Sequence, residues 1–351
     1  MNMHLEKESQ QELQRMVSWI IMFVAVLVAV LLLSETGQGF SAQFAVFRTR
    51  FLGIFIEAVP FLLLGAAVSG LIGAFVTADS LAAYLPRNRY MATTTGAMLG
   101  FVFPVCECGV VPVARRLINK GMPPSMAISF LLAAPFMNPV VFAATYTAFG
   151  FGQVFFLRFI VTLIVAVTVG LLFAAFGRTE KIVLPQHLAA IRGASVDVDH
   201  VHVDTSHIEL KNTATIISKL QNALHSAIED FFDMARYLII GCILAALMQT
   251  VIPQGALQSL GSGNISSVLT LQATAFILSV CSTVDSFLAL AFVGTFSTGS
   301  IVAFLTFGPM VDIKSTMMFL GVFPRRVVAI LIALPFAMTF MAGVLINLFL
   351  V

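Results

Sequence analysis

The chain has 351 residues, of which 59% are hydrophobic and 10% are charged, and its formal net charge is +2. Because soluble globular proteins carry about 25% charged residues, this composition excludes an ordinary soluble domain and indicates a multi-pass membrane protein. The small net charge gives no reason to expect nucleic acid as a partner, so the expected partners are the lipid bilayer and a small inorganic or organic substrate.

Nine stretches of the chain are candidates for membrane spans, because a spanning helix needs about 20 predominantly apolar residues. They are 17–34, 51–77, 91–118, 123–149, 153–176, 230–252, 267–291, 300–320 and 327–350. The sequence therefore predicts an all-α polytopic membrane protein with about nine transmembrane segments. The first stretch lacks a small-residue cleavage site, so we expect it to be retained as a span.

Two of these stretches are interrupted near their middle. One contains Cys106-Glu-Cys-Gly-Val-Val-Pro112, and the other contains Pro135-Phe-Met-Asn-Pro139. A proline inside a continuous helix costs about 3 kcal/mol, and Gly109 allows the chain to turn without a Cβ penalty. Broken backbone is tolerated in a bilayer only where it is buried in protein or lines a wet cavity. We therefore expect discontinuous helices that meet at mid-membrane.

The two halves of the chain resemble each other at three places. The matched pairs are separated by 174 to 176 residues, and they are Glu57 with Asp233, Cys106 with Cys281, and Pro135 with Pro309. This near-constant separation predicts two parallel four-helix repeats about an axis along the membrane normal. The predicted domains are an N-terminal segment with an extra helix (1–50), a first repeat (51–176), a hydrophilic linker (177–229) and a second repeat (230–351).

The distribution of lysine and arginine in short loops sets the orientation of a membrane protein. With nine spans, Arg48, Arg115 and the basic residues of the linker lie on one side, whereas Arg87 and Arg325 lie on the other. The excess on the linker side predicts a cytoplasmic linker and an external N-terminus.

Three cysteines are candidate ligands. Cys106 and Cys108 coincide with the first break, and Cys281 occupies the matching position of the second half. Thiolates prefer soft partners such as Cu(I), Zn(II) or arsenic-like centres, so these residues are predicted to bind substrate or metal. The alternative is that they are small buried residues, and this alternative is favoured for Cys242, which lies in an unbroken apolar stretch. A secreted disulfide framework is not expected.

Three carboxylates lie within apolar segments. Glu107, Asp285 and Asp312 are expected to bind a cation or to carry protons, because an acid at the membrane centre costs about 2.5–3.5 kcal/mol. The alternative is a structural ion pair, for which Lys314 is the nearest base. The remaining predicted substrate-binding positions lie at the breaks and are Gly109, Pro135, Asn138 and Pro139. For Asn138, an equal alternative to substrate binding is that its amide caps a broken helix. Glu57 is expected near the membrane–water interface.

The linker contains three histidines interleaved with acids. His200, His202 and His207 could bind zinc or copper loosely, and the alternative is a solvated polar linker. No phosphate-binding Walker loop is present, and we expect no cofactor and no enzymatic activity.

Two motifs resemble a known family. Cys106-Glu-Cys-Gly-Val-Val-Pro-Val-Ala-Arg-Arg-Leu117 followed by Lys120-Gly-Met-Pro123, and then Phe130-Leu-Leu-Ala-Ala-Pro-Phe-Met-Asn-Pro139, look like the bacterial predicted permeases of the YraQ/ArsP type, which include organoarsenical effluxers. The similarity covers essentially 50–350. It implies a secondary permease of the bacterial plasma membrane, with Cys106, Cys108, Pro135, Asn138 and Pro139 at motif positions.

Three functions are compatible with these observations. The first is a permease that exports a thiophilic metal or metalloid species, with Cys106 and Cys108 as ligands. The second is a permease for a small organic or sulfur-containing solute. The third is a membrane-embedded thiol oxidoreductase that uses the same two cysteines. Both a homo-oligomer and an assembly with an accessory subunit are compatible with the sequence.

Overall fold

The structure is a computed structural model that describes residues 40–76, 81, 86, 88–101, 106–176, 212–251, 263 and 265–349. Within these ranges the chain is helical and forms no β-strand. The first half contains α2 (Phe40–Phe75), α4 (Arg89–Leu99), α5 (Glu107–Asn119), α6 (Pro124–Ala133), α7 (Pro139–Phe149) and α8 (Gln153–Phe176). The second half contains α11 (Asn212–Val251), α13 (Ser266–Leu278), α14 (Ser282–Leu288), the 3-10 helix η1 (Ala289–Phe292), α15 (Thr298–Met310), α16 (Ile313–Leu320) and α17 (Arg325–Phe349).

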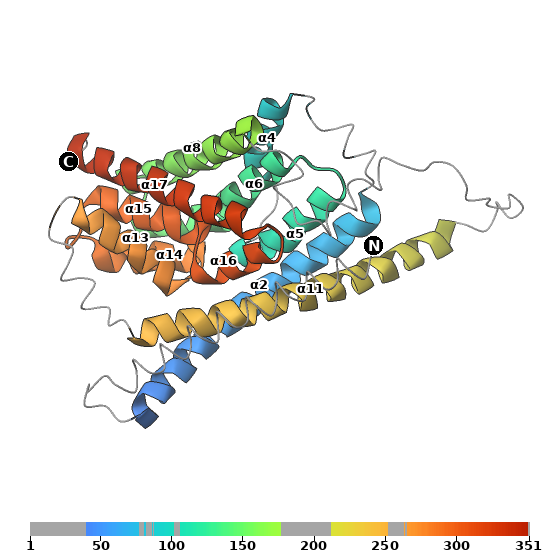
Figure 1. Cartoon of the computed structure of the whole chain (residues 1–351), viewed down its shortest axis with the longest axis horizontal. Coiled ribbons are helices and arrows are strands. Elements are labelled where there is room, and N and C mark those ends of the chain that lie inside the picture. The colour runs from blue at the N-terminus through green and yellow to red at the C-terminus, as the bar shows by residue number, and fades with distance from the viewer. Residues whose placement is uncertain are drawn as a thin grey trace, which may run out of the picture.

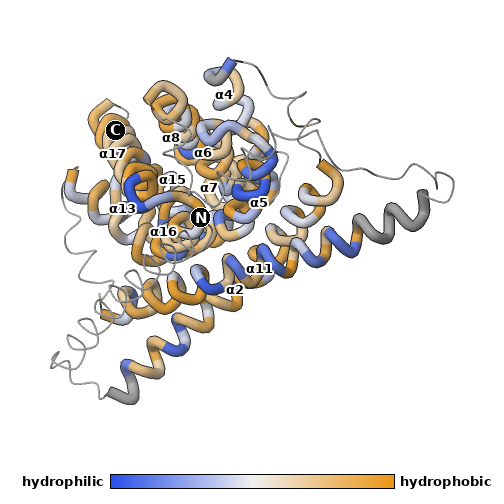
Figure 2. The backbone as a smooth tube through the Cα atoms, turned by 45° about the vertical axis from the view of Figure 1, so that its right-hand side comes forward, coloured by the Kyte–Doolittle hydropathy of each residue, from blue (hydrophilic) through white to orange (hydrophobic). Residues whose placement is uncertain are grey.

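The exterior of the helix assembly is apolar, as expected for lipid contact. Figure 2 shows hydrophobic residues along α2, α8 and α17. Their large exposed side chains include Ile56, Leu63, Phe156, Ile160, Ile164, Met341 and Leu345. Five helical stretches of the described chain are long and apolar enough to cross a membrane. The all-helical, multi-pass character is thereby confirmed, whereas the predicted stretch 17–34 lies outside the described residues.

Helices α4 and α5 form a hairpin, which corrects the prediction of a span over 91–118. Gly96 packs against Met126 and Gly100 packs against Ala134, so α4 runs parallel to α6. Because only residues 120–123 join α5 to α6, α5 runs in the opposite direction to α6 and therefore to α4. Hydropathy alone cannot distinguish such a re-entrant hairpin from a span, since both are apolar.

Helices α13 and α14 form a similar hairpin in the second half. The hydroxyls of Ser267 and Ser300 lie 2.7 Å apart, and Gly308 packs against Ala275, so α13 runs parallel to α15. After α14 the chain returns through η1, whose Phe292 packs on Phe304 of α15 with ring centroids 5.3 Å apart. The predicted stretch 267–291 is therefore not one continuous span.

Two further helix pairs cross the assembly as broken spans. Gly170 of α8 packs against Ser125 and Ser129 of α6, and Arg158 of α8 donates a hydrogen bond to Thr145 of α7. Helices α6 and α7 thus both run opposite to α8 and together make one traverse. Helices α15 and α16 make the equivalent traverse beside α17, and the span Thr298–Leu320 is 94% buried inside the molecule. The predicted breaks are present in both pairs, and their depth in the membrane stays a prediction.

Helices α2 and α11 pack along each other on one side of the molecule and run in opposite directions (Figure 1). Gly70 of α2 packs against Ala223 and Ala227 of α11, which permits this close approach. Because these helices begin the two halves, the halves start from opposite ends of the molecule. The predicted parallel relation of the halves is therefore wrong. We call the end at which α2 and α8 finish and α11 starts the linker end, and the other the far end.

Candidate functional site

Four helices begin inside the molecule, each directly after a break. Their N-cap residues are Cys106 for α5, Asn138 for α7, Cys281 for α14 and Asp312 for α16. The first turn of a helix leaves backbone N–H groups without helical partners and carries a partial positive charge. All four N-caps are residues that the sequence singled out.

An ion cluster joins the starts of α5 and α16. The Lys314 ammonium lies 3.2 Å from Glu107 Oε1 and 3.6 Å from Asp312 Oδ2, and at most 2% of each side chain is exposed. We call these three residues the Lys314 cluster. Asp312 also caps α16, because its Oδ1 accepts a hydrogen bond of 2.6 Å from the Ser315 backbone N–H. The alternative of an ion pair is therefore realised for Glu107 and Asp312.

Each carboxylate of the Lys314 cluster keeps one oxygen that accepts no hydrogen bond. These atoms are Glu107 Oε2 and Asp312 Oδ2, and both are buried. Buried polar atoms are hydrogen-bonded in the great majority of cases, so unpaired oxygens in a natural protein need an explanation such as an exchangeable ligand.

The cysteines surround this cluster. All four are free and buried, and the thiols of Cys106 and Cys108 lie within hydrogen-bonding distance of each other. Cys281 lies close to the carboxylates of Glu57 and Glu107. In the described part of the chain, no group of three His, Cys, Asp or Glu side chains is arranged to hold a metal ion. Cys106 and Cys108 are thus neighbours, and the described residues contain no preassembled metal centre.

Arg158 forms a second buried polar group that the sequence analysis missed. Its guanidinium donates hydrogen bonds of 2.6 Å to the hydroxyls of Thr145 and Ser286 and one of 3.0 Å to the Ser282 carbonyl. The side chain is fully buried and lies within electrostatic range of Asp285. An arginine in the apolar stretch 153–176 was a detectable signal, because charged residues within spans are rare.

Several predicted site residues serve the backbone instead. Gly109 lies inside α5, and a Cβ atom there would be 2.9 Å from the Phe61 carbonyl oxygen, so it permits helix packing and not a turn. Pro112 also lies inside α5 and does not end it. Asn138 caps α7 by accepting a hydrogen bond of 2.9 Å from the Val140 N–H. Pro139 is exposed at the first position of α7, which corrects its expected place in the buried site.

Two further residues singled out in the sequence, Pro135 and Glu57, lie near the breaks. Pro135 is buried in the connection between α6 and α7, as expected. Glu57 was expected near the interface, but its side chain lies close to Cys281 and its Oε1 is buried without a hydrogen-bond partner. The predicted His200, His202 and His207 lie outside the described residues.

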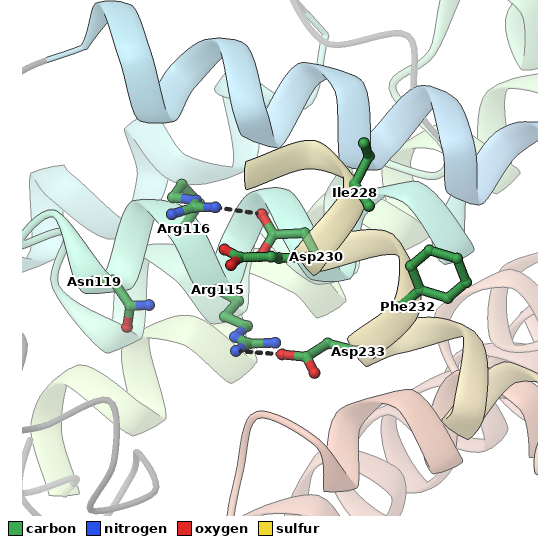
Figure 3. Close-up of a pocket in the computed structure, with 8 residues that line it drawn as sticks. Arg115, Arg116, Asn119, Ile228, Asp230, Phe232 and Asp233 are labelled. Atoms are coloured by element: carbon green, nitrogen blue, oxygen red, sulfur yellow. Dashed lines mark hydrogen bonds and ion pairs between the residues drawn. The ribbon is translucent and has the colours of Figure 1, made fainter. Parts of the chain in front are cut away.

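A pocket of about 530 Å³ opens at the linker end between α5 and α11 (Figure 3). Arg115 pairs with Asp233 at 3.0 Å, and Arg116 pairs with Asp230 at 2.8 Å. The Ser69 hydroxyl of α2 donates a hydrogen bond of 2.6 Å to Asp230. These contacts hold α2, α5 and α11 together at one end of the molecule, away from the breaks.

Known proteins resemble this chain over most of its length. The family model described as predicted permease, of the ArsP type, matches residues 43–348. The UPF0718 protein YcgR of Bacillus subtilis is 38% identical over 292 residues, which cover 83% of this chain and 93% of that protein. A Streptococcus mutans protein named as a candidate subunit of a two-component membrane permease complex is 40% identical over 277 residues, covering 79% of this chain and 86% of its own.

A more distant relative is also found. The UPF0718 protein MJ0584 of Methanocaldococcus jannaschii is 27% identical over 119 residues, about a third of either chain. No solved structure matches this chain.

Proposed function

The chain belongs to the ArsP-type family of predicted permeases, and from this premise we propose that it is a secondary permease whose substrate binds where α5 and α16 begin. The observation that carries the proposal is the coincidence of helix breaks, free thiols and unpaired buried carboxylate oxygens at one place. Paired breaks in corresponding halves are the sequence feature that points to a transporter binding site.

The proposed substrate is a thiophilic metal or metalloid species, and the proposed direction is efflux. Cys106 and Cys108 would contact it through sulfur, and Cys281 would add a third thiol from the second half. Glu107, Asp285 and Asp312 would balance its charge. A small organic or sulfur-containing solute is the second candidate, supported by the largely apolar walls around the thiols.

The two halves are proposed to be inverted repeats. In the first half Gly170 packs against Thr93 and Ser129, and in the second half Gly343 packs against Val268 and Ala303. The matching residues are again 173 to 175 residues apart. Together with the opposite directions of α2 and α11, these contacts support alternating access by rocking of one half against the other. The Pro135–Pro139 connection would act as a hinge.

The linker end is proposed to face the cytoplasm. With the helix directions found, six basic residues of the described chain lie at this end: Arg89, Arg115, Arg116, Lys120, Arg325 and Arg326. At the far end Arg48 and Arg50 lie near the start of α2. This bias is stronger than that of the nine-span arrangement and supports the same cytoplasmic linker.

The test is transport in everted membrane vesicles, with cadmium and trivalent arsenite as probes. The Cys106→Ser/Cys108→Ser protein is expected to reach the membrane but to lose uptake of the probe, because oxygen is a poor ligand for soft centres. Thr147→Val is the control, since that hydroxyl is exposed and donates a hydrogen bond only to Ala143 within its own helix, and it is expected to transport normally. Unchanged uptake by the double variant would exclude thiol ligation.

The same vesicles test the remaining alternatives. A membrane thiol oxidoreductase would change the thiol content of the protein during turnover, whereas a permease would not. The Streptococcus mutans relative named after a two-component complex supports an accessory subunit as a further requirement. Uptake by purified protein reconstituted alone would show that no such subunit is needed.

A further inference from the structure

The Lys314 cluster contains more acid than base. Glu107 and Asp312 are both in contact with a single ammonium, and Glu57 lies within electrostatic range of the same group. All three elements that carry these acids, α2, α5 and α16, meet at the breaks. A buried group of this composition attracts a cation more strongly than a neutral or anionic solute.

The ammonium of Lys314 lies where such a cation would bind. It is 3.2 Å from Glu107 Oε1, and Glu107 stands between the two thiols in sequence. Two like charges at one carboxylate repel each other strongly at low dielectric. A soft cation that binds to the thiols and Glu107 must therefore displace the lysine.

Asp312 offers the displaced ammonium a place to move. Asp312 Oδ2 is 3.6 Å from the Lys314 Nζ and accepts no hydrogen bond. A small rotation of the lysine side chain would close this gap to hydrogen-bonding distance as it leaves Glu107. Glu107 would then present both carboxylate oxygens to the substrate.

From these contacts we infer that Lys314 is the internal counter-cation of the empty permease, which a soft metal cation displaces from Glu107 when it binds. This inference rests on the proposed substrate site and narrows its substrate to a cation. In the empty state the lysine neutralises Glu107 and allows the unloaded protein to change conformation.

The first test is equilibrium binding of Cd²⁺ to the purified protein. Lys314→Met removes the ammonium that competes with Cd²⁺ for Glu107, so the variant is expected to bind Cd²⁺ about a hundredfold more tightly. If Lys314 had only a structural role, its loss would weaken Cd²⁺ binding. Lys314→Arg keeps the charge and is expected to bind as the original protein does. Lys120→Met is the control, because Lys120 is a partly buried lysine that contacts only backbone carbonyls of Gly73 and Val76.

The second test compares two modes of transport in proteoliposomes. Lys314→Met is expected to retain Cd²⁺/Cd²⁺ exchange but to lose net Cd²⁺ flux, because only net flux requires the unloaded protein to change conformation. The Glu107→Gln/Lys314→Met protein lacks both charges. Its ratio of net Cd²⁺ flux to Cd²⁺/Cd²⁺ exchange is expected to return close to that of the original protein, and its affinity for Cd²⁺ is expected to be lower than that of the original protein. This double variant also provides a test if Lys314→Met alone does not fold.

Three results would overturn the inference. One is Cd²⁺ binding that is weakened by Lys314→Met and not restored by Lys314→Arg. Another is an equal loss of exchange and net flux in Lys314→Met. The third is transport of arsenite, which is neutral at pH 7, without any transport of Cd²⁺, which would leave the permease function intact and reject a cationic substrate. Tighter Cd²⁺ binding by Lys314→Met without transport of any probe would instead support the lysine's role and reject the permease function.

Discussion

Lys314 and Arg158 are both fully buried bases, but their surroundings differ. Lys314 contacts two carboxylates, each of which keeps an oxygen without a hydrogen-bond partner. Arg158 donates to two hydroxyls and a carbonyl and lies near one carboxylate, Asp285. The first group has two carboxylates for one base. The second has one carboxylate near one base, and three hydrogen bonds hold the base in place.

This difference distinguishes a group that can exchange its ligand, the Lys314 cluster, from a group that holds helices together, the one around Arg158. A buried charge that donates hydrogen bonds to several fixed dipoles holds its neighbours in one geometry. The two terminal nitrogens of Arg158 tie α8 to α7 and α14 in this way, although its Nε has no hydrogen-bond partner. A cluster with unpaired oxygens has unused binding capacity, which a substrate can fill. The comparison can be tested by making the same substitution, Asp to Asn, in each group.

The largest effect is expected from Asp285→Asn. It leaves the buried Arg158 charge without the carboxylate in its electrostatic range, and a buried charge that loses its counter-charge costs up to about 3–5 kcal/mol. The measurement is thermal unfolding of the detergent-purified protein, in which the fraction of protein that stays monodisperse is recorded against temperature. Adding Arg158→Met to Asp285→Asn is expected to recover part of the loss. A melting temperature equal to that of the original protein would show that Arg158 does not depend on Asp285.

A smaller effect is expected from Asp312→Asn. Asparagine is as good an N-cap as aspartate, and Lys314 keeps Glu107 as its partner, so the cost should be about 1 kcal/mol. Asp312→Ala removes the cap as well and is expected to cost about 1 kcal/mol more. The same unfolding assay measures both. If Asp312→Asn lowered the stability as much as Asp285→Asn, the Lys314 cluster and the Arg158 group would not differ in their contribution to stability.

The smallest effect is expected from Arg115→Gln at the linker end. Its ion pair with Asp233 is partly exposed, with 18% and 40% of the two side chains accessible to solvent. Such pairs contribute about 0.2–1 kcal/mol and weaken as salt is added. Unfolding at low and high ionic strength measures the contribution. A loss as large as that of Asp285→Asn would assign the linker-end contacts a structural role as strong as that of the buried groups.

The positions of the breaks could be predicted from the sequence, because they depend on local chemistry. Cys106, Asn138, Cys281 and Asp312 were all singled out, and all four occupy the N-cap positions of half-helices. Only Asn138 and Asp312 accept a capping hydrogen bond. Proline alone was a weaker guide, since Pro60 and Pro112 lie inside helices that continue past them.

The direction of each helix could not be predicted in the same way. Hydropathy reports how apolar a stretch is and not which way it runs, so the two hairpins were counted as spans and the repeats as parallel. Directions became visible only through contacts between distant residues, such as Gly96 with Met126. The same limit hid Glu57, whose proximity to Cys281 depends on the packing of α2 against the second half.

Helix α11 has 40 residues, so it is about 60 Å long, roughly twice the thickness of the hydrocarbon core. It carries Asp230 and Asp233 near its centre and Gly241, beside Lys314, in the half that leads to the far end. Unlike the half-helices, it contains no proline and no break. It therefore has the form of a stiff lever, in which a slight tilt beside Lys314 becomes a displacement of several ångström at the tip that receives the linker.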